Sequence, residues 1–469
     1  MNRILIPAFL CLSIVVTAQD KSVQLNQLLG TANLPGIQLA YTHGSHTEFY
    51  NIGTIGDGSA KPITSNTIFE AASLSKCVFA YAVLRLYDRG ILNLDTPLLP
   101  ILGSYDRFDP RDPAYSRITA RMVLHHTTGL PNWGDSAGAR LRFPPDSCFS
   151  YSGEGYLFLQ KVVEKITGKS LNDIAREEVF TPLGMTSSSY CRTAAHDSVY
   201  AFGNSPDAIK SHSGQNAASS LLTNAHDYSL FLQAVATGRG LKPATHRMML
   251  GLPPYSAIPA NWFNHPHTEA TAHITWGLGV GLQDGKAFWH WGDNGGFKAF
   301  YIDYPSTHES LVYFVHNWRG LFITQEVFDL FFGRQPCWAI RWSGEGYESP
   351  WSMDAFRTAL EKQGFDKAAA IHEQLLKDPG VQLAENDLNE YGFLLLQTAR
   401  KEQALAIFRL NLDLHPQSAN CFDSIAEAYE AMDEKEKALD NFRRSFQLNP
   451  KNDYAAQHIK QLEASIQTK

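Results

Sequence analysis

The sequence predicts a mixed α/β domain with antiparallel strands, followed by an all-α domain of helical repeats. Strand patterns occur at both ends of the first domain, in residues 35–56 and 276–317, and helical patterns lie between them. A 34-residue repeat begins at Glu385 and indicates stacked helix pairs. The chain has 469 residues, of which 44% are hydrophobic, so it is long enough to bury more than one core.

The charge of the chain argues against two classes of partner. Charged residues make up 19% of the sequence, and the formal net charge is -7. Proteins that bind nucleic acid or anionic membrane surfaces carry a clear basic footprint. We therefore expect neither kind of partner.

The first 18 residues have the pattern of a secretory signal peptide. Arg3 supplies an early positive charge, residues 4–16 are apolar, and small residues precede a cleavage point after Ala18. Cys11 follows Leu10, not the small residue of a lipoprotein signal. The apolar run is too short to span a membrane stably. The sequence therefore predicts a secreted protein, with the bacterial periplasm as its expected destination and no transmembrane segment after cleavage.

Few cysteines remain after the predicted cleavage. They are Cys77, Cys148, Cys191, Cys337 and Cys421. An odd and sparse set is not a disulfide framework, and a large core does not require one. A single bridge, such as Cys148 to Cys191, stays open.

Turn signals define the strands of the first domain. Residues 35–56 read as two strands around a polar turn, which suits the edge of a sheet. Near the other end, Asp284-Gly285 is a tight hairpin signal. The strands expected there are residues 277–283, 286–291, 297–303 and 310–316. They form three or four antiparallel strands in a row, and His290-Trp291-Gly292 ends one of them.

The stretch from Phe69 to Arg89 predicts a helix that is buried on nearly every side and ends at Gly90. Ser73 and Lys76 lie three residues apart at its start, so the amine is within reach of the hydroxyl. A serine is a weak nucleophile until a neighbour takes its proton. Burial and the positive helix N-terminus lower the pKa of Lys76, so its amine can act as that base. The same N-terminus offers backbone N–H groups to a developing oxyanion.

A lone S-x-x-K tetrad is expected by chance about twice in a chain of this length, so its companions decide its meaning. Residues 120–131, ARMVLHHTTGLP, predict a short helix closed by a turn. The adjacent His125 and His126 point about 100° apart on a helix and cannot readily share an ion, so we predict no metal site. Residues 149–170 predict a glycine-broken loop, which holds Tyr151, followed by a helix.

The composition changes between the two domains. Residues 344–349 read as a linker, which places the first domain in residues 23–343 and the second in residues 350–467. Residues 355–378 read as a degenerate helix pair ahead of the repeats. The repeat positions, which resemble those of tetratricopeptide repeats, are Gly392, Ala404, Phe408 and Pro416 in one unit and Ala426, Ala438, Phe442 and Pro450 in the next.

Five short stretches of the sequence match those of a known family. They occur in the family's order and with similar separations. They are FEAASLSK, LHHTTGLP, YSGEGY, AASSLLTNAHDY and HWGDNGGF. Between Val23 and Gly333 the chain resembles the serine β-lactamase and penicillin-binding-protein superfamily. The branch it looks most like is the class C β-lactamase-like one, which includes D-Ala-D-Ala carboxypeptidases, D-amino-acid peptidases and esterases. The resemblance implies an antiparallel sheet of N-terminal and C-terminal strands, with a helical lobe inserted between them.

The resemblance also implies roles for individual residues. Ser73 is the acylated nucleophile, Lys76 is its partner on the helix, and Tyr151 is the phenol that passes protons to the leaving group. His290 lines the third wall of the site. The other implied positions are the backbone N–H groups of Ser73 and Asp293 as an oxyanion hole, and Gly153, Trp291 and Gly292 for substrate binding.

Two residues depart from the family pattern. Gly153 stands where many members have an asparagine, whose amide binds a substrate amide, and His290 stands where many have a lysine. Histidine carries no permanent charge at pH 7, so both departures weaken the case for β-lactam substrates and leave acyl hydrolysis intact.

The leading prediction is an exported serine hydrolase that acts through a Ser73 acyl-enzyme on an ester or a D-amino-acid amide. This chemistry needs no cofactor and no metal. The alternative is a penicillin-binding or sensing protein with little turnover, which signals to a protein or peptide partner through its helical repeats.

Overall fold

The computed structural model describes most of the chain. The described residues are 18–32, 34–56, 58–136, 138–203, 214–263, 269–344, 350–377, 381, 383–397 and 399–467. The predicted signal peptide lies outside them except for Ala18, where helix α1 (Ala18–Thr31) begins. Within these ranges, no helix combines the length and the apolar character that crossing a membrane requires.

An eight-stranded antiparallel sheet forms the centre of the first domain, in the order β2-β1-β10-β9-β8-β7-β6-β5. The pairing of β1 with β10 joins the N-terminal hairpin to the C-terminal strands, with Leu39 opposite Tyr313. This confirms the predicted sheet, and β5 and β6 extend it beyond the predicted strands. The strands are β1 (Gly36–His43), β2 (His46–Gly53), β5 (Ile258–Pro259), β6 (Ile274–Trp276), β7 (Gly281–Gln283), β8 (Ala287–Asp293), β9 (Lys298–Tyr304) and β10 (Glu309–Val315).

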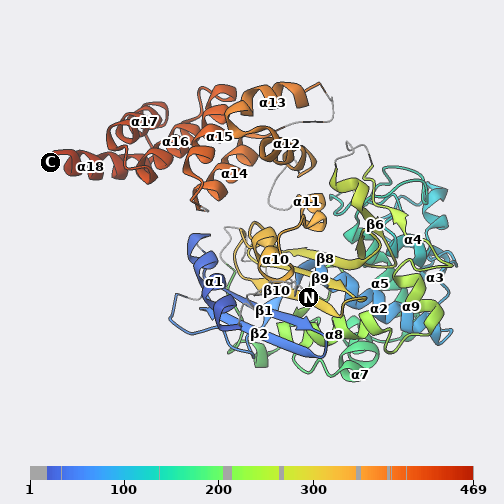
Figure 1. The fold of residues 1–469 in the computed structure, drawn as a ribbon. Coiled ribbons are helices and arrows are strands. Elements are labelled where there is room, and N and C mark those ends of the chain that lie inside the picture. The colour runs from blue at the N-terminus through green and yellow to red at the C-terminus, as the bar shows by residue number, and fades with distance from the viewer. Residues whose placement is uncertain are drawn as a thin grey trace, which may run out of the picture.

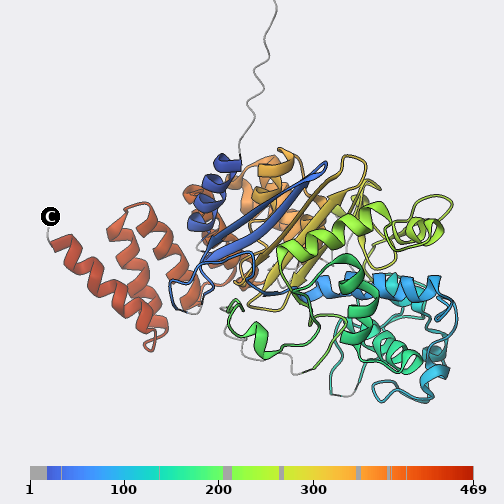
Figure 2. The ribbon, with the colours of Figure 1, turned by 90° about the horizontal axis from the view of Figure 1, so that it is seen from below.

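Helices cover both faces of the sheet (Figure 2). Alternate residues of a strand point to opposite faces, so neighbouring residues enter different cores. In β8, Phe288 belongs to the core that includes residues of helices α2, α5 and α8, whereas Trp289 belongs to the core that includes residues of α1, α10 and α11. The helices of the first domain are α1, α2 (Ser75–Asp88), α3 (Leu99–Leu102), α4 (Ala120–Leu124), α5 (Gly153–Thr167), α6 (Leu171–Ala175), α7 (Thr181–Leu183), α8 (Ala225–Thr237), α9 (Pro243–Met249), α10 (Thr324–Phe332) and α11 (Trp338–Ser343).

Helix α2 lies between the sheet and the inserted helical lobe (Figure 1). A short two-stranded sheet, β3 (Phe69–Glu70) with β4 (Leu222–Thr223), and a 3₁₀ turn at Ala72–Leu74 lead into it. The helix is buried along its length apart from its last turn and ends before Gly90, whose φ of 73° is the left-handed conformation that glycine adopts easily. The predicted buried helix is therefore confirmed, with Ser73 in the 3₁₀ turn at its entrance.

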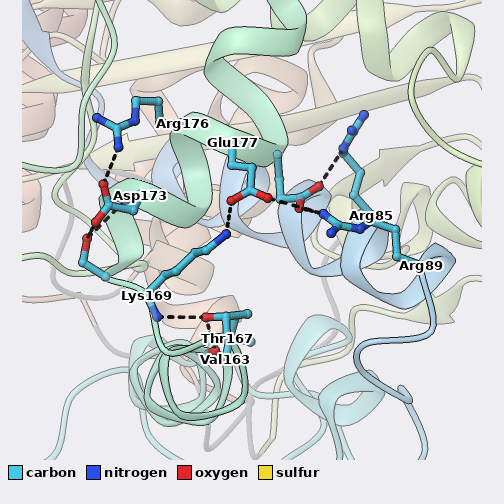
Figure 3. Close-up of polar contacts among 10 residues, drawn as sticks. Arg85, Arg89, Val163, Thr167, Lys169, Asp173, Arg176 and Glu177 are labelled. Atoms are coloured by element: carbon cyan, nitrogen blue, oxygen red, sulfur yellow. Dashed lines mark hydrogen bonds and ion pairs between the residues drawn. The ribbon is translucent and has the colours of Figure 1, made fainter.

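The far end of α2 is fastened by charged side chains (Figure 3). The Glu178 carboxylate, 3% exposed, pairs with Arg85 at 3.2 Å and with Arg89. Glu177, which is 44% exposed, pairs with Lys169 and lies 3.8 Å from Arg89. Because both carboxylates come from the π-helical turn at 176–180, this cluster ties α2, the helix that carries Lys76, to the lobe.

Removal of the buried carboxylate is expected to cost stability. Glu178→Ala leaves Arg85 and Arg89 without their buried partner, which lowers the free energy of unfolding by about 3 kcal/mol. Glu177→Ala is the matched control, with an expected loss of less than about 0.5 kcal/mol because its pairs are exposed. Urea unfolding followed by circular dichroism measures both. Equal losses in the two variants would contradict the assignment.

The cysteines of the described chain are free thiols, so the bridge between Cys148 and Cys191 left open above is not formed. Cys77 is buried on α2, next to Lys76, and accepts a hydrogen bond from Tyr301 at 3.2 Å. Burial raises the pKa of this thiol to about 12. A thiol with so high a pKa is a poor nucleophile, so Cys77 does not compete with Ser73, which stands in the turn before this helix.

A run of helices follows Pro350 and fits a tetratricopeptide-like array (Figure 1, orange to red). The helices are α12 (Pro350–Gln363), α13 (Ala368–Leu375), α14 (Glu385–Gln397), α15 (Lys401–Leu414), α16 (Ala419–Ala431), α17 (Lys435–Leu448) and α18 (Asp453–Gln467). A Cβ on Gly392 would lie 2.2 Å from the Phe408 ring, so glycine lets paired helices approach closely. The array has its own apolar core, which also takes in Phe322 of the first domain.

Candidate active site

Ser73 and Lys76 lie together at the entrance of α2. Lys76 Nζ is 3.0 Å from Ser73 Oγ and donates a hydrogen bond to the carbonyl oxygen of Ala218 at 2.9 Å. The lysine side chain is completely buried. One N–H of a neutral amine satisfies Ala218, and its lone pair is then free to accept the Ser73 proton. The structure thus brings together the predicted nucleophile and the predicted base.

Burial lowers the pKa of Lys76 from 10.5 to about 7. Water solvates an ammonium far better than a protein interior does, so desolvation is the main cause. The aromatic face of Tyr151, with its centre 4.8 Å from Nζ, favours the charged form by about 0.5–2 kcal/mol and does not reverse the shift. At neutral pH a large fraction of this amine is unprotonated and able to act as a base.

The backbone before Ser73 turns sharply. Ala72 has a φ of 48°, which side chains rarely adopt, and this conformation joins the end of β3 to the 3₁₀ turn. Strand β8 approaches the same turn closely, because a Cβ on Gly292 would lie 2.5 Å from the carbonyl oxygen of Ala71. A larger residue than Gly292 would push β8 away, and with it the predicted oxyanion donor Asp293.

Asn294 fastens the segment that follows β8. Its Nδ2 atom donates to Glu70 Oε2 at 2.7 Å and to the Ser219 carbonyl oxygen at 3.1 Å. Asp293 pairs with Lys298 and accepts a hydrogen bond from Gly295 N at 2.7 Å. Asn294 therefore connects β8, β3 and the Ala218 loop around the serine. The sequence reasoning missed it, although it directly follows the His-Trp-Gly-Asp stretch.

Tyr151 lies above the lysine and is held by His126. The two rings are 4.5 Å apart. Ser150 N donates to the His126 carbonyl oxygen at 2.8 Å, and Ser152 N donates to His126 Nδ1 at 3.0 Å. His126 therefore contacts the Tyr151 ring and bonds to the backbone on both sides of it. We assign His126 the role of positioning Tyr151.

The conformation and charge of His126 fit that role. Its φ of 58° is uncommon for a residue other than glycine, and its ring lies against the Tyr151 loop. Because Nδ1 accepts a hydrogen bond, the ring proton lies on Nε2. Burial and the nearby Lys76 hold the pKa of His126 well below its usual range, so the ring is neutral. From the sequence, His126 was weighed only as a metal ligand, and its positioning role was missed.

Tyr151→Phe is expected to reduce kcat on a nitrophenyl ester by about 10² to 10⁴, because the variant lacks the hydroxyl that the family resemblance predicts to pass protons to the leaving group. Tyr156→Phe is the matched control, since this buried tyrosine also lies over Lys76, with its ring centre 5.8 Å from Nζ. We expect less than about a threefold change in the control. Steady-state kinetics measures both, and similar losses in the two would contradict a specific role for Tyr151.

His290 and Trp291 both lie on β8 and are buried. His290 Nδ1 donates to the Trp291 carbonyl oxygen at 2.6 Å, which leaves Nε2 as an acceptor with no partner in the described part of the chain. Burial lowers the pKa of His290 to about 3, so it is neutral at pH 7. The Trp291 ring packs against Tyr151 at 4.8 Å. That contact supports the tyrosine, and the substrate-binding role of Trp291 stays a prediction.

Gly153 opens α5, where Ser152 caps the helix by accepting a hydrogen bond from Gly155 N at 3.0 Å. The indole of Trp133 lies against this glycine and, with its centre 5.9 Å away, also near Lys76 Nζ. The sequence reasoning passed over Trp133, which stands two residues after the Gly-Leu-Pro turn. The role of Gly153 in substrate binding stays a prediction.

An antiparallel sheet with an inserted helical lobe, together with a serine and a lysine at the entrance of a buried helix, defines a serine hydrolase of the β-lactamase and transpeptidase type. The sequence profile of the family described as Beta-lactamase matches residues 24–325. The chain belongs to this family, whose members are serine hydrolases. The resemblance predicted from the five stretches is therefore confirmed.

Curated relatives match part of the chain. Penicillin-binding protein 4 of Amycolatopsis lactamdurans is 32% identical over 171 residues, which are 33% of this chain and 44% of that protein. Esterase EstB of Burkholderia gladioli is 29% identical over 197 residues, which are 35% of this chain and 48% of that protein. The D-alanyl-D-alanine-carboxypeptidase/endopeptidase AmpH of Escherichia coli strain K12 is 24% identical over 177 residues, which are 33% of this chain and 45% of that protein. Each match spans less than half of the relative.

Solved structures share the fold of the first domain. A class C beta-lactamase superposes with a TM-score of 0.53 at 20% identity, over 64% of this chain and 91% of its own. D-amino acid amidase from Ochrobactrum anthropi SV3, complexed with L-phenylalanine amide, superposes with a TM-score of 0.51 at 22% identity and the same shares. These likenesses confirm the predicted fold class.

Proposed function

We propose that the protein is an exported serine hydrolase that forms an acyl-enzyme at Ser73 and hydrolyses an ester or a D-amino-acid amide. The observation that carries this proposal is the 3.0 Å approach of Ser73 Oγ to the buried amine of Lys76, whose pKa is about 7. The relatives support the substrate class, because they include an esterase and a D-alanyl-D-alanine carboxypeptidase. Export to the periplasm rests on the leader pattern of residues 1–18.

The reaction runs in two steps. Lys76 takes the proton of Ser73 as Oγ bonds to the carbonyl carbon, and the carbonyl electron pair moves to oxygen, which the backbone N–H groups of Ser73 and Asp293 stabilise. The bond to the leaving group then breaks as Tyr151 delivers a proton to it, and the proton that Lys76 took from Ser73 passes to the phenol oxygen of Tyr151. A water molecule then attacks the acyl-enzyme ester: its oxygen bonds to the acyl carbon as the bond to Oγ breaks, and one of its protons goes to Oγ. The acid leaves, and Ser73 has its hydroxyl again.

The polar groups at the site argue against β-lactams as good substrates. Gly153 offers no amide, and His290 is neutral at pH 7 because burial lowers its pKa. Lys298 is a nearby cation on β9, but Asp293 pairs with it. A carboxylate-bearing penicillin therefore finds no free cation among these residues.

A panel of substrates with one chromogenic readout tests the proposal. We expect many turnovers per protein on nitrophenyl esters or on D-amino-acid nitroanilides, and slow turnover of nitrocefin. Intact-mass analysis with a fluorophosphonate is expected to show one adduct, which peptide mapping places on Ser73. Efficient hydrolysis of nitrocefin would overturn the substrate class, and the absence of both turnover and adduct would overturn the function.

One observation favours the sensing alternative. Phe322 of the first domain is part of the core of the helical array, and Trp318 packs against the same core, so a change in one domain has a direct path to the other. In that case a protein or peptide partner binds the array, and the site acylates without turning over. A burst of one product per protein, with no steady state after it, is the result that would favour sensing over hydrolysis.

A further inference from the structure

Trp133 fills the space beside Gly153. A Cβ built on Gly153 would lie 2.8 Å from Cη2 and 2.9 Å from Cζ3 of the Trp133 indole, and 2.9 Å from the carbonyl oxygen of Asn132. Side-chain carbons do not approach other heavy atoms this closely. The glycine therefore lets the indole lie against the start of α5. An asparagine at position 153, as in the family pattern, would collide with the indole in this position.

The backbone on both sides of Trp133 is fixed to the first turn of α5. Gly153 N donates to the backbone oxygen and to the side-chain Oδ1 of Asn132, each at 3.0 Å. Gly134 N donates to Oε1 of the buried Glu154 at 2.8 Å. These bonds fix the backbone that carries the indole.

Trp133 is exposed although it adjoins the reactive pair. The residue is 48% exposed, whereas Tyr151 and Tyr156, the other two rings over Lys76, are buried. The centre of the indole lies 5.9 Å from Lys76 Nζ. An aromatic or bulky apolar group that covers the indole removes apolar surface from water, which favours its binding.

We propose that Trp133 forms the subsite for the acyl group and selects substrates in which that group is aromatic or bulky and apolar. The proposal rests on the acyl-enzyme function at Ser73. The acyl carbon bonds to Ser73 Oγ, 3.0 Å from Lys76 Nζ, so a group on that carbon comes within reach of an indole near the same amine. An apolar contact thus takes the place of the amide contact that an asparagine would make at Gly153.

Two nitrophenyl esters with the same leaving group and different acyl groups, acetate and phenylacetate, test the proposal. Trp133→Ala is expected to lower kcat/KM for the phenylacetate by about tenfold or more, chiefly through KM, because it removes a stacking partner of the acyl group. The acetate is expected to change by less than about threefold. Trp133→Phe keeps an aromatic face and is expected to restore most of the preference.

The rate of fluorophosphonate labelling at Ser73 reports that the variants are folded and keep their reactive pair. Equal losses on both esters, or an unchanged preference for phenylacetate in Trp133→Ala, would overturn this inference while leaving the proposed function in place. A wild-type protein that is neither labelled nor active on any ester would overturn the proposed function and this inference with it.

Discussion

Ser73→Ala is expected to abolish both ester hydrolysis and covalent labelling by a fluorophosphonate. The Ser73 hydroxyl is the group that lies 3.0 Å from the buried amine, and its removal leaves no atom there to bond to the substrate. Loss of a nucleophile of this kind lowers kcat by at least about 10⁴-fold. Steady-state kinetics and intact-mass analysis measure the two effects.

Ser219→Ala is the control for this prediction. Ser219 is a buried serine in the Ala218 loop, and its Oγ has no hydrogen-bond partner in the residues that the structure describes. Loss of that hydroxyl leaves the serine and lysine pair intact, so activity is expected to stay within about threefold of the wild type. An adduct that persists in Ser73→Ala, or an equal loss in Ser219→Ala, would show that the nucleophile lies elsewhere.

Much of the fold was predictable because its signals are local. Hairpin turns such as Asp284-Gly285 and the helical spacing after Ser73 specify elements without reference to the rest of the chain. The face shared by Ser73 and Lys76 follows from three-residue spacing alone. What the spacing could not supply is the environment that lowers the pKa of Lys76, since Ala218 and Tyr151 reach it from distant segments.

The parts of the site that escaped prediction depend on backbone conformation and close approach. His126 has a positive φ and accepts hydrogen bonds from the backbone on both sides of Tyr151, and no local pattern in the sequence indicates these contacts. Asn294 connects segments that lie more than 70 residues apart in the sequence. From the sequence, Gly153 indicates only the loss of an asparagine amide, whereas the structure shows that the Trp133 indole packs against it. Each case is a contact between distant segments, which a single sequence leaves unspecified.

Lys76→Met is expected to lower kcat/KM on a nitrophenyl ester by about 10² to 10⁴, because methionine fills a similar volume and cannot accept the Ser73 proton. In the wild type, kcat/KM is expected to rise with pH and to reach half its maximum near pH 7. Below that pH the amine binds a proton and its lone pair is no longer available, so activity falls as pH falls. In Lys76→Met this rise should be absent.

The neighbouring histidines do not account for a change in rate near pH 7. Burial lowers the pKa of His290 to about 3 and that of His125 to about 4, and it holds the pKa of His126 well below its usual range. These rings stay neutral across the pH range in which the lysine titrates, so a rise in rate near pH 7 that disappears with Lys76 belongs to its amine. A wild-type profile that is flat from pH 6 to pH 9, or a rise that persists in Lys76→Met, would contradict its role as the base. Circular dichroism of the variant checks that it is folded, since Lys76→Met removes the hydrogen bond to Ala218 as well as the proton acceptor.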